Sequence, residues 1–140
     1  MSIFKTTIFL LALAVVAFAD SAPQQATLPV FVDADMPLYF PLARQANIQG
    51  KVEVAIQVDE SGKVVAATRL SGHPLLAQAA IDNAKTWRFA PRRGAGTLLY
   101  EFKIEGKVDT ENPYYKYGKV IFRPPNSVEI DFPVPVVVHD

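Results

Sequence analysis

The sequence contains no cysteine, only two histidines and no net charge. Without cysteine there is no disulfide framework, so a hydrophobic core must hold the fold together. The 14 basic and 14 acidic side chains cancel, and the largest basic cluster is the pair Arg92 and Arg93. A nucleic-acid-binding surface would need an excess of basic residues on one face. Nucleic acid is therefore not an expected partner, and the histidines and scattered carboxylates show no spacing typical of a metal site.

A recognisable catalytic arrangement is also missing. His73 has no acid or nucleophile in a matching pattern, and its place before Pro74 suits the start of a helix better than a general base. Trp87 and Phe89 would suit either a stacking platform or the core, and their place at the end of an amphipathic pattern favours the core. We therefore expect no enzyme activity, no cofactor and no small-molecule substrate.

The apolar run near the N-terminus, residues 8–19, is too short to span a bilayer as a helix, which needs roughly 20 residues. It ends in Ala17, Phe18 and Ala19, a small-x-small pattern typical of signal-peptide cleavage. We interpret residues 1–19 as a signal peptide, with an uncleaved membrane anchor as the alternative. Residues 20–35 are assigned to a short tether that reaches at most about 55 Å when fully extended. Both interpretations place the domain outside the cytoplasm.

Alternating patterns predict a compact set of elements between residues 36 and 106. A short helix over residues 36–46 is followed by a hairpin, whose strands at 51–58 and 63–70 flank a turn containing Gly62. An amphipathic helix begins at Pro74. A loop at residues 94–96 then leads to a third strand at 98–105, apolar on one face and charged on the other. This order predicts an α+β fold, in which two helices cover one face of an antiparallel sheet of about three core strands.

The last part of the chain, residues 107–140, is expected to be a β-rich extension. Residues 119–122 and 127–131 flank a turn with Pro124 and Pro125, which suits a second hairpin. Residues 134–138 also favour β structure, but the neighbouring prolines would confine them to a sheet edge.

Taken together, these segments resemble the C-terminal domain of TonB proteins. No single motif is specific. Asp59, Gly62 and Val64, for example, fit the pattern of any hairpin turn. The whole series, however, follows the family's order and spacing. The matching residues are Pro37, Tyr39, Pro41, Leu42, Ala43, Arg44, Ile48, Gln49, Gly50, Lys51, Val52, Val58, Asp59, Gly62, Val64, Ser71, Gly72, His73, Pro74, Leu75, Leu76, Ala79, Ala80, Trp87, Phe89 and Pro91.

The resemblance implies a protein-binding module of the periplasm. TonB proteins work with a motor complex in the inner membrane and bind TonB-dependent outer-membrane receptors, whose short TonB box is added to the sheet edge as an extra strand. By resemblance, the accepting strand is the third one, and Leu99, Glu101, Lys103 and Glu105 would flank the peptide. Backbone N–H and C=O groups supply the affinity in this mode, so no reactive side chain is needed.

The chain departs from the family's transducer pattern in its short, cleavable apolar segment, its short tether and its C-terminal extension. We therefore expect a stand-alone periplasmic module, with a membrane-anchored energy transducer and a strand-swapped homodimer as alternatives. Two further points stay open. The tail, through residues 134–138 or 120–122, would itself suit the border of the third strand, either as a displaceable plug or as a permanent closing strand. Tyr114, Tyr115 and Tyr117 suit either an interface or a cover for the open face of the sheet.

Overall fold

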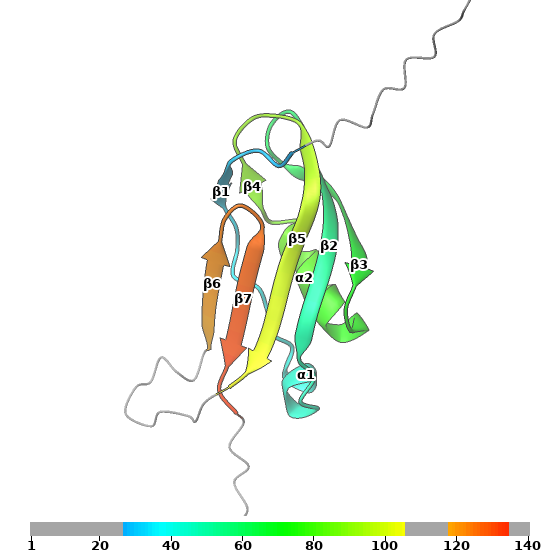
Figure 1. The fold of residues 1–140 in the computed structure, drawn as a ribbon, viewed down its shortest axis with the longest axis vertical. Helices are drawn as coiled ribbons and strands as arrows, with labels where there is room; N and C mark the ends of the chain where they lie inside the picture. Colours follow the sequence, from blue (N-terminus) through cyan, green and yellow to red (C-terminus); the bar gives the residue numbers. More distant parts are fainter. Residues whose placement is uncertain (1–26, 106–117, 135–140) are drawn as a thin grey trace, which may run out of the picture.

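The computed structural model describes residues 27–105 and 118–134 (Figure 1). No helix in these two ranges combines the length and apolar character that crossing a membrane requires. The elements, in chain order, are β1 Phe31–Asp33, α1 Pro41–Gln45, β2 Gly50–Val58, β3 Val64–Ser71, α2 Pro74–Ala84, β4 Arg88–Phe89, β5 Gly94–Ile104, β6 Lys119–Arg123 and β7 Ser127–Phe132.

One sheet of five strands forms the body of the domain, in the order β3-β2-β5-β7-β6 (Figure 1). β2 pairs antiparallel with both β3 and β5, which confirms the predicted three-stranded core. β7 lies beside β5 and runs parallel to it, and β6 pairs antiparallel with β7. The second predicted hairpin is thus confirmed. Because β7 runs parallel to β5, the sheet is mixed, whereas the sequence predicted antiparallel pairing alone.

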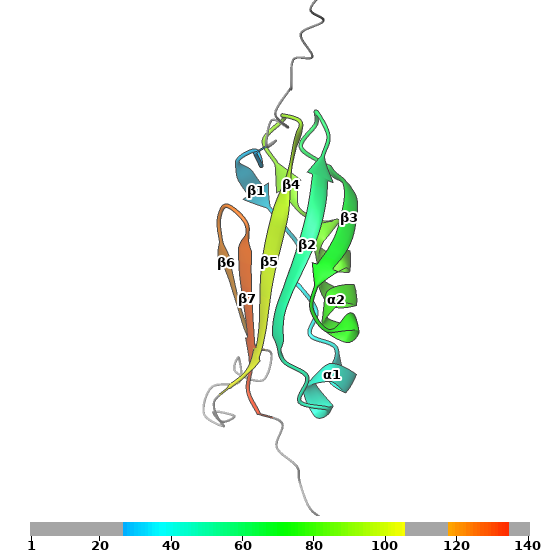
Figure 2. The ribbon, with the colours of Figure 1, turned by 45° about the vertical axis from the view of Figure 1, so that its right-hand side comes forward.

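The hydrophobic core lies between one face of this sheet and a layer that contains both helices. α2 packs across β2, β3 and β5, and α1 lies on the same side near the start of β2 (Figure 2). Within the described ranges the opposite face carries no helix, so the predicted α+β arrangement is confirmed. Strand alternation explains the buried set, because every second side chain points toward the helices. Its members on β2, β5 and β7 are Val52, Val54, Ile56, Val58, Leu98, Tyr100, Phe102, Ile104, Val128 and Ile130.

The turn between β2 and β3 is built by Asp59 and Gly62. The Asp59 carboxylate accepts hydrogen bonds from the Ser61 N–H at 2.9 Å and the Lys63 N–H at 3.0 Å. Its hydrogen bond from the Ser61 hydroxyl is the main cause that lowers the pKa of Asp59. Gly62 adopts φ of 85°, and a Cβ there would lie 1.9 Å from the carbonyl oxygen of Phe89. Only glycine therefore lets the hairpin tip dock against β4.

The short first helix begins later than the sequence predicted. α1 covers only Pro41–Gln45, and the preceding residues 36–40 are not helical. The reason is steric, because a residue before proline is pushed out of the helical region, and both Met36 and Phe40 precede a proline. The extended segment instead places Tyr39 in the core, where burial raises its pKa to about 12.

Two regions assigned to irregular structure are ordered parts of the fold. Residues 27–35, the second half of the expected tether, contain β1, which pairs with β4. Residues 94–96, the expected loop, begin β5. These two observations share a cause: a Cβ at Gly94 or Gly96 would lie 2.6 Å from atoms of residues 27 and 28. The glycines allow close approach of the N-terminal segment rather than a turn.

Candidate functional site

The candidate peptide-binding residues from the sequence lie on β5. Leu99, Glu101 and Lys103 occupy the helix-free face of this strand, and Glu105 follows directly after its end. β5 is not at the edge of the sheet, because β2 borders it on one side and β7 on the other. The sequence left open whether this border is free or closed by the tail, and the structure shows it closed. The role of these four residues in peptide binding stays a prediction.

The chain's own β7 fills the border of β5 over six residues of each strand. At one end, the Leu99 N–H donates to the carbonyl of Asn126 at 2.8 Å, and at the other the Glu105 N–H donates to the carbonyl of Phe132 at 2.9 Å. The Asn126 side chain adds a hydrogen bond to the carbonyl of Thr97 at 3.0 Å. Of the alternatives left open by the sequence, the tail does close this border, but through residues 127–132. The predicted closing segment 120–122 is wrong, because it lies in β6 and pairs with β7 instead.

Apolar side chains anchor the hairpin in the common core. Val128 and Ile130 on β7 are 1% and 0% exposed. Phe132 meets the ring of Tyr39 edge-on, with centroids 5.5 Å apart. On β6, the Phe122 ring stacks on Phe31 at a centroid distance of 5.9 Å. The hairpin is therefore bound through side chains as well as through its backbone.

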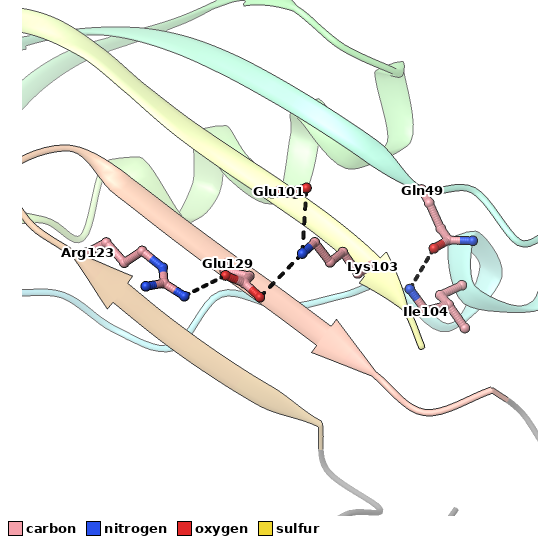
Figure 3. A network of polar contacts seen from close by, with 6 residues as sticks. All are labelled: Gln49, Glu101, Lys103, Ile104, Arg123 and Glu129. Atoms are coloured by element: carbon pink, nitrogen blue, oxygen red, sulfur yellow. Dashed lines mark hydrogen bonds and ion pairs between the residues drawn. The ribbon is translucent and has the colours of Figure 1, made fainter. Parts of the chain in front are cut away.

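Charged side chains connect β5, β7 and β6 on the helix-free face (Figure 3). The Lys103 ammonium lies 3.7 Å from Glu101 and 3.5 Å from Glu129, and Glu129 also contacts Arg123 at 2.9 Å. The Arg123 hydrogen bond is the main cause that lowers the pKa of Glu129. Desolvation pulls the pKa of Lys103 down, but the carboxylates of Glu101 and Glu129 outweigh it, so the pKa of Lys103 is raised. This network ties the hairpin to the strand that it borders.

The far end of the same border carries Asp131. Burial is the main cause that raises the pKa of this carboxyl, and the neighbouring Glu105 raises the pKa further. Among the described residues, its buried Oδ1 has no hydrogen-bond partner. On the other side of β5, the Ile104 N–H donates to the side chain of Gln49 at 2.7 Å (Figure 3).

Nowhere in the described ranges do three or more histidine, cysteine or acidic side chains gather in a way that would hold a metal ion.

The remaining sequence candidates have structural positions. His73 caps α2, where its Nδ1 accepts the Leu75 N–H at 3.2 Å. Trp87 and Phe89 are buried in the core, as the sequence favoured. Arg92 and Arg93 lie in the loop before β5, and the exposed Arg93 pairs with Glu60 at 3.1 Å. The interface candidates Tyr114, Tyr115 and Tyr117 lie outside the described residues, as does most of the segment 134–138.

One buried polar residue was missed in the sequence. Asn83 on α2 accepts hydrogen bonds from the Trp87 indole at 3.1 Å and the Tyr100 hydroxyl at 2.8 Å, and donates to the carbonyl of Asp35 at 2.6 Å. It thereby joins the helix to β5 and to the N-terminal segment. A signal was present, because Asn83 falls at helical spacing between the apolar Ala80 and Trp87.

The order α1, β2, β3, α2, β5, with both helices on one face, defines a small α+β domain of the predicted kind. The family model for the Gram-negative bacterial TonB protein C-terminal domain matches residues 35–109, more than half of the chain. The chain belongs to this family, and it is a TonB-type module of the bacterial envelope.

Comparison with solved structures finds the solution NMR structure of the Pseudomonas aeruginosa TonB CTD. The identity is 21%, the TM-score is 0.49, and the similarity covers 62% of this chain and 94% of that one. No curated protein was found to match the chain. The hairpin of β6 and β7 lies beyond the residues that the family model matches.

Proposed function

We propose that this protein is a non-enzymatic binding module that accepts an extended peptide of a TonB-dependent outer-membrane receptor as an added strand on β5. One observation carries the proposal. The border of β5 already holds an added strand, and that strand, β7, comes from a segment outside the matched family domain. This border therefore has the geometry, the backbone hydrogen-bonding groups and the apolar positions that strand addition requires.

In this proposal the peptide exchanges with the hairpin. It would take the place of β7 while Leu99, Glu101 and Lys103 flank it on the helix-free face. The pattern of β7 indicates which peptides fit. Val128 and Ile130 fill buried positions, and Glu129 between them meets Lys103. We expect preferred peptides to share this apolar, acidic, apolar order, because an uncharged middle residue would remove the carboxylate that Glu129 now offers to Lys103.

A reversible covalent lock tests the exchange. The chain has no cysteine, so the double variant Leu99→Cys and Ser127→Cys carries the only two thiols. These positions are direct register partners, and neighbouring strands are close enough for a disulfide. A labelled synthetic TonB-box peptide and a labelled peptide with the sequence of residues 126–132 serve as probes. Fluorescence anisotropy should show binding to the reduced form and at least about tenfold weaker binding to the oxidised form.

The matched control is the single variant Ser127→Cys, whose affinity should not change with the redox state. Equal affinity for the oxidised and reduced double variant would contradict exchange at β5. Absence of binding by the wild type and by the reduced double variant would contradict strand addition on β5 altogether.

We also infer export to the periplasm with removal of residues 1–19. Mass spectrometry of the protein recovered from a Gram-negative host should give a mature chain that begins at Asp20. A full-length mass in the membrane fraction would instead support the anchored transducer.

A further inference from the structure

β3 forms the edge of the five-stranded sheet that lies opposite the hairpin of β6 and β7. Within residues 27–105 and 118–134 no strand pairs with its outer side (Figure 1). β3 is eight residues long and contains no proline. Its pairing with β2 is regular from Ala66 to Arg69, between two register shifts. Over these four residues, the N–H and C=O groups that alternate along its outer side present a regular template for another strand.

The other edge strand is protected in ways that β3 is not. β6 has only five residues, begins after Gly118 and ends before Pro124. Its terminal Arg123 is held by Glu129, and its Phe122 is stacked beneath Phe31. Short length, prolines and flanking charges are the usual devices that prevent pairing at a sheet edge. β3 instead exposes two large apolar side chains, Val65 at 60% and Leu70 at 56%.

The charge on β3 indicates what kind of strand would fit. Its single charged residue is Arg69, and the strand contains no aspartate or glutamate. The Arg69 guanidinium donates to the carbonyl of Gly72 at 3.3 Å. It forms no ion pair with any carboxylate among the described residues. A second copy that paired through its own β3 would bring another Arg69 and no carboxylate to the border, whereas an acidic strand would supply a partner for Arg69.

The helix-free face beside this border leaves room for the side chains of an added strand. Small residues on β2, β3 and β5 line a shallow hollow of about 460 Å³ there. Three of them are Ala55, Ala66 and Thr68. Diagonal neighbours on adjacent strands lie close enough to contact one another, so long side chains of a guest strand would lie over these small ones.

We propose that β3 is a second interaction border of this protein, which binds an extended acidic segment of another protein by strand addition. The border is separate from β5, so one module would hold two strands at once. Because a lock between β5 and β7 leaves β3 untouched, success or failure at one border is distinguishable from the other.

Hydrogen exchange of the full chain, followed by NMR, tests this proposal. The probes are two capped eight-residue peptides, one in which valine alternates with glutamate and one with lysine in place of glutamate. The glutamate peptide should bind about tenfold tighter or more, and should slow exchange at amides within residues 64–71 but not at β6. The oxidised Leu99→Cys, Ser127→Cys variant should bind it equally well.

Arg69→Glu should reverse the preference between the two peptides, whereas the matched change Lys119→Glu on the opposite edge should leave it unaltered. Equal binding of both peptides to the wild type would overturn the proposal, as would an unchanged preference in Arg69→Glu. Slowed exchange at β5 or β6 instead of β3 would also overturn it. If exchange at residues 64–71 slows with protein concentration alone, the occupant is a second copy and the acidic partner is refuted.

Discussion

At the scale of single residues, two polar side chains have opposite consequences for stability. Asn83 is 5% exposed, and its side chain satisfies the buried Trp87 indole and Tyr100 hydroxyl as well as the partly buried carbonyl of Asp35. Asp131 is partly buried, and one of its oxygens finds no hydrogen-bond partner within residues 27–105 and 118–134. A satisfied buried amide stabilises the surrounding structure, whereas a poorly satisfied carboxylate destabilises it.

We expect Asn83→Ala to lower the free energy of unfolding by about 3 kcal/mol, because the Trp87 indole and Tyr100 hydroxyl would remain buried without an acceptor. Urea denaturation followed by tryptophan fluorescence measures this change. Gln78→Ala on the exposed side of the same helix, where Gln78 contacts Asp82, is the control and should cost less than about 0.5 kcal/mol. Similar costs for the two variants would show that the Asn83 contacts contribute little.

Asp131 should make stability depend on pH. Its pKa is raised in the folded protein above the ordinary 3.8, so the folded state binds the proton more tightly than the unfolded chain does. Ionisation therefore destabilises the fold as the pH rises from 3.8 through the raised pKa. We expect Asp131→Asn to stabilise the protein at neutral pH, by less than about 1 kcal/mol, and to lose this advantage in acid.

Glu129→Gln is the informative counterpart in the same urea titrations. Because the pKa of Glu129 is lowered, its contribution to stability is present above the ordinary 4.5 and disappears as the pH falls through the lowered pKa. The two variants should therefore differ from the wild type in opposite directions at neutral pH. Effects of the same sign would contradict this assignment.

At the scale of elements, local sequence patterns predicted most of the strands and helices, but they did not predict which strands pair with each other. The alternation of Val52, Val54 and Ile56 identified β2, and Gly62 and Pro74 marked the turn and the helix start. The hairpin of β6 and β7 was recognisable for the same reason. Its position beside β5 was not, because alternation shows which face of a strand is buried but not which border accepts it. For this reason the sequence left open whether the tail or a partner peptide occupies the border of β5.

The hairpin itself offers a matched pair of substitutions. Ile130→Ala should cost about 2–4 kcal/mol, because Ile130 is 0% exposed and lies opposite Phe102 in the register with β5. Ile121→Ala, on the helix-free face of β6, should cost less than about 1 kcal/mol. Thermal and urea unfolding measure both. If exchange at β5 is correct, Ile130→Ala should also raise peptide affinity and Ile121→Ala should not.

At the scale of the whole molecule, the sheet closes its central strand within one chain. β5 pairs on both sides, and β7 and β6 complete the core with Val128, Ile130 and Phe122. A strand-swapped homodimer would have to take β7 from a second copy to reproduce the same contacts. Pairing with β7 of the same chain is favoured over pairing with β7 of a second copy, because joining two chains costs additional entropy.

We therefore expect the purified protein to be a monomer at micromolar concentration. Multi-angle light scattering coupled to size exclusion should give the mass of one chain, independent of loading concentration. The reduced and oxidised forms of the double cysteine variant should elute alike, because the disulfide lies within one chain. A doubled mass, or crosslinked dimers on non-reducing gels, would support strand exchange between copies.

The parallel pairing of β7 with β5 also affects how the domain would respond to a mechanical load. Thr27 lies beside Gly94 at the start of β5, whereas Val134 follows β7, which ends beside the end of β5 (Figure 1). A pull between these two residues runs along the strands rather than across them. A pull on Val134 along β7 would load its hydrogen bonds with β5 in shear, so that they share the tension, whereas a pull on Thr27 first reaches β1 and its pairing with β4. The border between β5 and β7 is thus oriented to resist a pull along its strands.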